Sequence, residues 1–245
     1  MKALSGWLLR ILDSSLRRLN SSPRFNRGDF NRPTLEVCRG LLGQRLIKLE
    51  SDGTRLSGLI IEAEAYIGQE DKGCHASSGV TKRNEIMWGP PGHAYVYFTY
   101  GMHWMLNFVT EEAGRPAAVL LRAILPVEGV PQMQERRSAW RRSRGVHGTA
   151  PWRNEAKRDA HDPSQFTDGP AKVCQALNID RAWNGRDLCH PESQLFIETR
   201  PTVQSVTTGP RMGLNSVPEP WKSIPWRFRV DRGHYEALLA EEDFA

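Results

Sequence analysis

Leu59-Ile60-Ile61-Glu62-Ala63-Glu64-Ala65-Tyr66-Ile67 is the segment around which the expected sheet is built. Every second side chain in it is apolar, which is the alternation of a β-strand that turns one face to a core. The opposite face carries Glu62, Glu64 and Tyr66. In an ordinary half-exposed sheet both carboxylates would simply lie in solvent. His75 follows after a short acidic loop, so a carboxylate, a tyrosine and a histidine are close enough in sequence to line one pocket.

The composition is that of a globular protein. The chain has 245 residues, 39% of them hydrophobic and 25% charged, and its net charge is +5. These values suit one domain with a sizeable core, and the positive excess favours a polyanionic partner without proving one. The apolar run that begins at Trp7 is broken by Arg10 and is far shorter than the roughly 18 residues of a spanning helix. We therefore expect neither a membrane segment nor a signal peptide.

The cysteines indicate a reducing compartment. Their spacing matches neither a zinc site nor a disulfide framework, so we expect free thiols in a cytoplasmic protein. A bacterial cytoplasm is the expected location because no basic cluster resembles an import signal; the nucleus or an organelle would be the location in a eukaryote. The four cysteines are Cys38, Cys74, Cys174 and Cys189.

The chain divides into a terminal arm, one domain and a short tail. Residues 1–30 are basic and rich in serine, and we expect a loosely attached N-terminal arm there. Residues 31–235 are expected to form the domain and residues 236–245 a C-terminal tail. The domain should begin with a helix from Leu35 to Leu42 that Gly43 ends.

Two hairpins are predicted. Asp52-Gly53 is a turn between strands at 45–49 and 56–67. The second hairpin runs from Ala94 to Val109, and its alternation places Tyr100 at the tip, on the face opposite Tyr97. An aromatic ring at an exposed tip is unfavourable unless it inserts into a partner, although it could also fold back onto its own sheet.

A further apolar strand, Ala117 to Leu125, is interrupted by Arg122. A buried arginine needs an acidic acceptor, and Glu62 and Glu64 are the candidates. Residues 136–158 form an arginine-rich tract that suits a phosphate-facing surface and a solvated helix and loop equally well. The remaining predicted elements are a helix at 171–177 and a strand at 226–230.

Many separated motifs lie in a characteristic order along the chain. They are Glu62-Ala63-Glu64-Ala65-Tyr66, His75, Arg83-Asn84, Tyr95-Val96-Tyr97, Tyr100-Gly101-Met102, Asn107, Leu120-Leu121-Arg122-Ala123 and Gly169-Pro170-Ala171-Lys172-Val173-Cys174-Gln175-Ala176-Leu177. In order and spacing they resemble the alkyladenine (3-methyladenine) DNA glycosylase family, from about Asn31 to Val230. The chain departs from the family pattern in its first 30 residues, in the arginine-rich tract and at Trp88-Gly89-Pro90.

The resemblance implies both a fold and a reaction. The expected fold is a single α+β domain, a curved antiparallel β-sheet or partly open barrel with flanking helices and a protruding β-hairpin. The expected enzyme is a monofunctional glycosylase of base excision repair, without metal or other cofactor and acting as a monomer. It would flip damaged purines out of double-stranded DNA and leave an abasic site. The implied substrates are 3-methyladenine, 7-methylguanine, hypoxanthine and ethenoadenine.

The resemblance also assigns the chemistry. It implies Glu64 as the base for the attacking water, with Arg122 beside it to keep the carboxylate ionised. Periodicity alone would allow Glu62 in the same role. No lysine lies in the matched pocket motifs, so water is the expected nucleophile rather than an amine.

Further residues are expected to contact DNA. The flipped base would lie against aromatic rings, whose π-faces favour a cationic alkylated purine. Asn107 would lie beside the C2 edge of that purine and discriminate against normal guanine; alternatively, it only satisfies the backbone of its neighbours. Tyr100 would enter the duplex from the minor groove. The implied base-binding residues are Tyr66, His75, Tyr97 and Asn107; the intercalating residues are Tyr100 and Met102; and the backbone candidates are Arg83, Asn84 and Lys172, the last of which is also a candidate structural contact.

Two other classes of function remain open at this point. A metal-dependent nuclease could use Glu62, Glu64, Asp71 and His75 as ligands, although the tyrosines would then have no role. A non-catalytic nucleic-acid-binding protein would use the tyrosines for stacking, although a carboxylate at Glu64 would repel phosphate.

Overall fold

The strand β2 (Arg55–Ile67) lies at the centre of the sheet. It pairs antiparallel with β5 (Ala117–Glu128) along one side. Its other side is shared by β1 (Arg45–Leu49) and β8 (Arg227–Val230). These pairings come from a computed structural model, which describes residues 23–144 and 164–240. The opening sequence stretch therefore contacts three strands.

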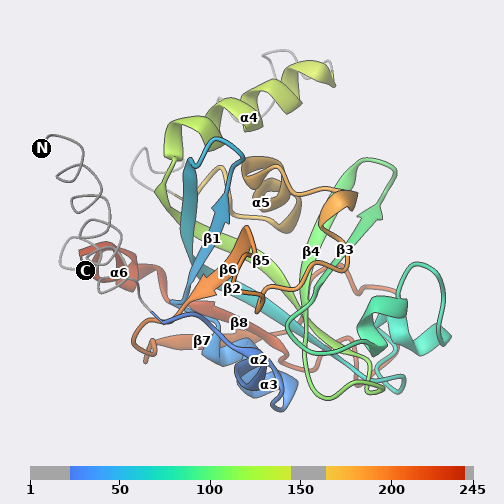
Figure 1. Cartoon of the computed structure of the whole chain (residues 1–245). Helices are drawn as coiled ribbons and strands as arrows, with labels where there is room; N and C mark the ends of the chain where they lie inside the picture. Colours follow the sequence, from blue (N-terminus) through green and yellow to red (C-terminus); the bar gives the residue numbers. More distant parts are fainter. Residues whose placement is uncertain (1–22, 145–163, 241–245) are drawn as a thin grey trace, which may run out of the picture.

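The remaining strands extend this sheet on both sides. The order is β3-β4-β5-β2-β1-β6, and β7 pairs with β8. The added strands are β3 (Ala94–Thr99), β4 (His103–Val109), β6 (Leu195–Glu198) and β7 (Val206–Gly209). The sheet curls into an antiparallel half-barrel with a few helices around it (Figure 1). The expected fold class, a single α+β domain, is confirmed.

The pairing of β2 with β5 is irregular at its middle. Ile60 pairs with Ile124 and Glu62 with Ala123, so Ile61 has no partner in this register. The next pair is Ala63 with Leu121, which leaves Arg122 unpaired on the other strand. Such bulges bend a strand and redirect its side chains. Here they lie at the position of the expected catalytic groups.

Helices cover the two ends of the half-barrel. The helix α3 (Thr34–Gly40) packs on β2 and β5, and α5 (Pro170–Leu177) packs on β4 and β5. The helix α4 (Val130–Ser143) lies outside α5, at the opposite end of the molecule from α3 (Figure 1). The expected helix at 35–42 thus ends earlier, and a turn follows in which Gly43 has a φ of +82°. The shorter elements are α2 (Arg27–Phe30), α6 (Tyr235–Ala240) and the 3-10 helices η1 (His75–Ser78), η2 (Glu85–Trp88), η4 (Arg181–Trp183) and η5 (Arg232–His234).

The main core lies between the sheet and these helices. Both faces of β2 are buried in its first half, and in its second half only Glu62, Tyr66 and Ile67 are partly exposed, so the simple alternation of a half-exposed strand does not hold. The helix α4 contributes only Met133 as a buried residue, and its arginines carry the first part of the basic tract. The rest of that tract, to residue 158, falls mostly outside the described residues. In the part of the chain that the structure describes, no helix is both long and apolar enough to cross a membrane.

Residues 23–30 are packed on the domain, contrary to the expectation of a loose arm up to residue 30. Phe30 is fully buried, and Phe25 is 7% exposed. The Phe25 N–H also donates to the Ile197 carbonyl at 2.9 Å, which adds the segment to the edge of the sheet. The expected tail likewise includes part of α6, in which Leu238 is buried. Residues 1–22 and 241–245 lie outside the described residues.

The second hairpin projects from the sheet (Figure 1), and its turn is strained. Tyr100 and Gly101 have φ angles of +51° and +64°, and Met102 N–H donates to the Thr99 carbonyl at 3.1 Å. A positive φ is unfavourable for a bulky side chain and often marks a functional position. The Tyr100 ring is 80% exposed, so it does not fold back onto its own sheet.

Replacing Phe30 by alanine should test whether the segment before residue 31 belongs to the core. We expect the free energy of unfolding to fall by about 3–5 kcal/mol because a fully buried ring is lost. Chemical denaturation measures this change. Val80→Ala, at a side chain 64% exposed, is the control and should change it by less than about 0.5 kcal/mol. A Phe30→Ala protein as stable as the parent would contradict the packing of this segment.

Candidate active site

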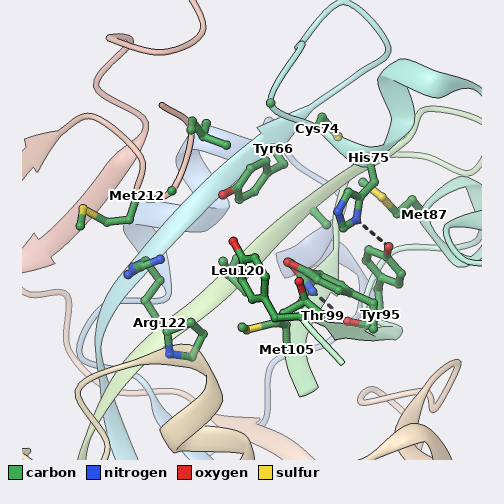
Figure 2. Close-up of a pocket in the computed structure, with 18 residues that line it drawn as sticks. Tyr66, Cys74, His75, Met87, Tyr95, Thr99, Met105, Leu120, Arg122 and Met212 are labelled. Carbon is green, nitrogen blue, oxygen red and sulfur yellow. Dashed lines mark hydrogen bonds between the residues drawn. The ribbon is translucent and has the colours of Figure 1, made fainter. Parts of the chain in front are cut away.

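A pocket of about 350 Å³ lies where β2, β5 and the β3–β4 hairpin meet two loops and the start of α5. Figure 2 shows Arg122 and Met212 on one side of this pocket and His75 with Tyr95 on the other. Its volume is in the range of small-molecule sites. The lining residues are Tyr66, Gly73, Cys74, His75, Met87, Tyr95, Tyr97, Thr99, Tyr100, Met105, Asn107, Ala118, Leu120, Arg122, Pro170, Met212, Gly213 and Leu214.

Glu64 lies directly behind the wall of this pocket and is fully buried. Its Oε2 accepts a hydrogen bond from the Tyr66 hydroxyl at 2.9 Å, and its Oε1 accepts one from the Met212 N–H at 2.7 Å. Arg122 Nη1 lies 3.3 Å from Oε1. Burial raises the pKa of the Glu64 carboxyl, while these three donors oppose that rise. A carboxylate held in this way is a candidate general base.

Arg122 joins both glutamates of β2, as the sequence predicted. Its Nε donates to Glu62 Oε1 at 2.8 Å, and its Nη1 faces Glu64. The β-bulges that leave Arg122 unpaired place the guanidinium between the two carboxylates. Glu62 is 20% exposed at its side chain, lies 3.7 Å from Arg227 and does not line the pocket. Neither glutamate lines the pocket, and their contacts separate them: Glu64 accepts hydrogen bonds from the pocket-lining Tyr66 and Met212, whereas Glu62 contacts Arg122 and Arg227.

His75 lies at the opposite wall as a neutral ring. Its Nδ1 lies 2.8 Å from the Tyr95 hydroxyl, and its Nε2 lies 3.1 Å from Arg83 Nη2. Because arginine can only donate, Nε2 accepts and the proton is on Nδ1. Burial and the charge of Arg83 lower the pKa of His75 to about 4. The histidine therefore carries no charge at neutral pH.

The other rings of the pocket are also uncharged. Burial raises the pKa of Tyr66 and Tyr95 and raises that of Tyr97 to about 12. His75 and Tyr97 meet edge to face, with ring centroids 4.5 Å apart. Tyr97 and Thr99 line the pocket together, as their alternation predicted. Tyr100, expected on the other face, also reaches the pocket because its positive φ breaks the alternation.

Three other predicted residues have well-defined positions. Asn107 lines the pocket, is 4% exposed and donates from Nδ2 to the Tyr95 carbonyl at 3.0 Å. Arg83 is exposed beside His75 and lies 4.9 Å from the Tyr97 ring centroid. Lys172 donates to the Asp168 carboxylate at 2.5 Å and to the Gln165 carbonyl at 3.1 Å, near the start of α5.

Asn84 does not suit the DNA contact that the sequence suggested. It is 2% exposed, and its amide holds the loop before the hairpin. Its Oδ1 accepts from the Thr81 N–H at 2.7 Å, and its Nδ2 donates to the carbonyls of His75 and Gly79 at 3.0 and 2.9 Å. Both amide atoms are thus occupied by backbone, so we assign Asn84 to loop structure.

Sequence reasoning missed the loop that follows β7. Met212 in this loop supplies a backbone donor to Glu64, and Arg211 forms a buried ion pair with Asp71. No periodicity relates residues 140 positions apart, so the pairing left no signal in the sequence. An isolated arginine within the sequence Gly-Pro-Arg-Met-Gly was the only local sign.

The ligand set that a metal-dependent nuclease would need is not assembled. Asp71 is bound by Arg211 through two hydrogen bonds, and Glu62 and Glu64 are bound by Arg122. His75 faces Tyr95 and Arg83 instead. Within residues 23–144 and 164–240, no three histidine, cysteine, aspartate or glutamate side chains are grouped as metal ligands.

Comparison with known proteins identifies the family. The profile of the methylpurine-DNA glycosylase (MPG) family matches residues 28–234. A protein of Methanocella arvoryzae, named "Putative 3-methyladenine DNA glycosylase", is 43% identical over 206 residues, which cover 84% of this chain and 92% of that relative. A protein of Myxococcus xanthus with the same name is 40% identical over 201 residues, which cover 82% and 87%. The chain therefore belongs to the methylpurine-DNA glycosylase family, and it is a DNA N-glycosylase of base excision repair.

Proposed function

We propose that this glycosylase removes alkylated and deaminated purines from duplex DNA by a metal-free hydrolysis in which Glu64 activates the water. The observation that supports the proposal best is the position of Glu64. It is a buried carboxylate beside an arginine, at the wall of a pocket lined by neutral aromatic rings. The substrates we propose are the 3-methyladenine, 7-methylguanine, hypoxanthine and ethenoadenine class.

The hairpin provides the means to extrude a nucleotide. Tyr100 and Met102 are exposed at its turn, and Tyr100 also borders the pocket. A glycosylase must take its base out of the helical stack, and an inserted side chain fills the gap that remains. Tyr100 is the proposed wedge, with Met102 beside it. Arg83, at the exposed rim of the pocket, is the proposed phosphate contact on that side.

The pocket favours a cationic purine over a normal one. Alkylation at a ring nitrogen gives the base a positive charge, which the π-faces of Tyr66 and Tyr97 would attract by about 1–2 kcal/mol. A protonated histidine would oppose that attraction. His75 avoids this because its pKa is lowered to about 4.

The reaction breaks the bond between the sugar C1′ and the purine nitrogen. The bonding electrons leave with the purine, positive charge develops on the sugar, and a water molecule attacks C1′ while its proton passes to Glu64. Arg122 keeps the carboxylate ionised until that step. Glu64 is covered by Tyr66, Arg122 and Met212. The water therefore reaches it only when one of these groups shifts, as catalytic contacts often do on substrate binding.

We also propose a monomeric, cytoplasmic enzyme. The cysteines support a reducing compartment, because all four are free and three are buried.

Replacing Glu64 by glutamine tests the proposed base. Glu64→Gln should bind lesion-containing duplex about as well as the parent but excise the base at least ~100-fold more slowly in single-turnover assays, because a general base is lost. Glu62→Gln is the matched control and should cost far less, since Glu62 contacts Arg122 from outside the pocket. Equal losses in the two variants would contradict the assignment.

A second experiment tests the nucleophile and the absence of a metal. A duplex with one hypoxanthine should lose its base in excess EDTA, and the strand should stay intact until alkali is added. Borohydride should trap no protein–DNA adduct, because a water nucleophile forms no Schiff base. Inactivation by the chelator would contradict the metal-free mechanism, and a trapped adduct would contradict the water nucleophile.

Asn107 is the proposed discriminator against normal guanine. Guanine differs from hypoxanthine by its 2-amino group, and a side chain anchored on the Tyr95 carbonyl cannot easily move away from that group. The resulting cost is roughly 1–3 kcal/mol. Asn107→Ala should raise the ratio of guanine to hypoxanthine excision in competition assays. A ratio within twofold of the parent would mean that Asn107 only satisfies its backbone neighbour.

A further inference from the structure

Arg211 is a buried arginine behind the pocket, outside the set of groups that the reaction uses directly. Its side chain and that of Asp71 are both 0% exposed. Both ends of its guanidinium donate to this carboxylate, at 2.5 and 2.7 Å. Further N–H groups donate to the carbonyls of Ala65 and Trp221 at 3.0 and 3.2 Å. The arginine therefore ties its own loop to β2, to the loop after β2 and to the segment before β8.

Two contacts relate this arginine to the active site. The guanidinium lies 4.6 Å from the centroid of the Tyr66 ring, whose hydroxyl donates to Glu64. The next residue in the chain is Met212, whose N–H donates to the other oxygen of Glu64 at 2.7 Å. Two of the three donors to Glu64 thus lie in contact with Arg211 or next to it in the chain.

The surroundings leave the guanidinium little freedom. Gly73 lies so close that a Cβ there would come within 2.9 Å of Arg211 Nη2. The Trp226 ring centroid lies 5.2 Å from the guanidinium carbon. Moving the arginine would therefore move the loop that carries Met212.

We propose that Arg211, clamped by Asp71, is a positioning residue that keeps the Met212 amide and the Tyr66 ring in place around Glu64. This inference rests on the proposed role of Glu64 as the base. The effect is one of geometry, since Arg211 and Asp71 cancel each other's charge. The titratable and charged groups packed around Glu64 are Arg122 from β5, Glu62 and Tyr66 from β2, Tyr97 from β3, Cys38 from α3 and Arg227 of β8, the register partner of Glu64; of these, Tyr66 and Arg122 contact its carboxylate.

The test is the pH dependence of single-turnover excision in Arg211→Lys and Asp71→Asn. Lysine keeps the charge but loses the two-pronged contact, and asparagine keeps the shape but loses the charge. The Met212 N–H lowers the pKa of Glu64, so a displaced amide lets that pKa rise. The base must be ionised, so when the pH is lowered the variants should lose activity at a higher pH than the parent does. We expect both variants to move the acid limb upward by roughly half a unit to one unit.

Other outcomes would overturn the proposal in distinguishable ways. A direct charge effect predicts no shift for Arg211→Lys and a downward shift for Asp71→Asn, because removing a negative charge favours the ionised carboxylate. Unchanged profiles in both variants would leave the pair a purely structural role. If Asp71→Asn is too unstable to assay, Arg211→Lys alone decides. An acid limb that persists in Glu64→Gln overturns the proposed base, and this inference with it.

Arg55→Lys is the matched control. Arg55 lies at the other end of β2 and also bridges carboxylates, with Nε 2.8 Å from Glu128 and Nη2 2.7 Å from Glu198. It should lower the melting temperature without moving the acid limb. A shift in this control equal to that of Arg211→Lys would show that the profile reports stability alone, and would overturn the positioning role.

Discussion

The central constraint in this protein is a fully buried carboxylate, that of Glu64, in the middle of the sheet. An isolated ion is expensive to bury, and the usual result is a neutral group with a raised pKa. Burial raises the pKa of Glu64, and three donors from different parts of the chain oppose that rise. They come from β2 itself, from β5 and from the loop after β7. A flat sheet could not bring these together, so the curl of the half-barrel and the bulges of its two central strands are conditions for the chemistry.

The titratable rings that line the pocket must, in turn, stay uncharged. The pocket contains rings whose charge could change, and burial moves each pKa in the direction that keeps the ring uncharged. His75 is the most telling case, because an exposed histidine titrates close to physiological pH. Its contact with Arg83 fixes the tautomer as well as the charge. The ion pair of Arg122 and Glu64 on one side of the pocket is therefore matched by uncharged rings on the other.

The sequence predicts most of what depends on local pattern. Alternation and turn residues locate β2 and both hairpins, because side-chain direction in a strand follows from position alone. The same rule fails at Tyr100, where a positive φ turns the ring toward the pocket. The sequence also cannot predict that the Asn84 amide bonds to the backbone of its own loop. An asparagine amide can bond equally to protein backbone or to DNA, and the residue type does not distinguish the two.

The bulges and the buried ion pair lie further beyond local pattern. Arg122 could be assigned to the glutamates because a buried arginine must have acidic partners. Which of the two glutamates bonds to the pocket-lining Tyr66 and Met212 has no signal in residue type. The pairing of Arg211 with Asp71 is a contact between two loops, and loops have no hydrophobic periodicity from which a contact could be predicted. The second layer of the site was therefore the part that required a structure.

The magnitudes also show why no single contact can account for selectivity. A cation–π preference of about 1–2 kcal/mol corresponds to roughly 5- to 30-fold, and a steric gate of about 1–3 kcal/mol to roughly 5- to 150-fold. Normal bases outnumber lesions by far more, since a genome offers some 10⁶–10⁹ competing sites. Extrusion adds a further few kcal/mol that damaged or mismatched bases partly avoid. In the proposed mechanism, insertion of Tyr100 and recognition in the pocket therefore act in sequence, and discrimination is the product of successive modest preferences.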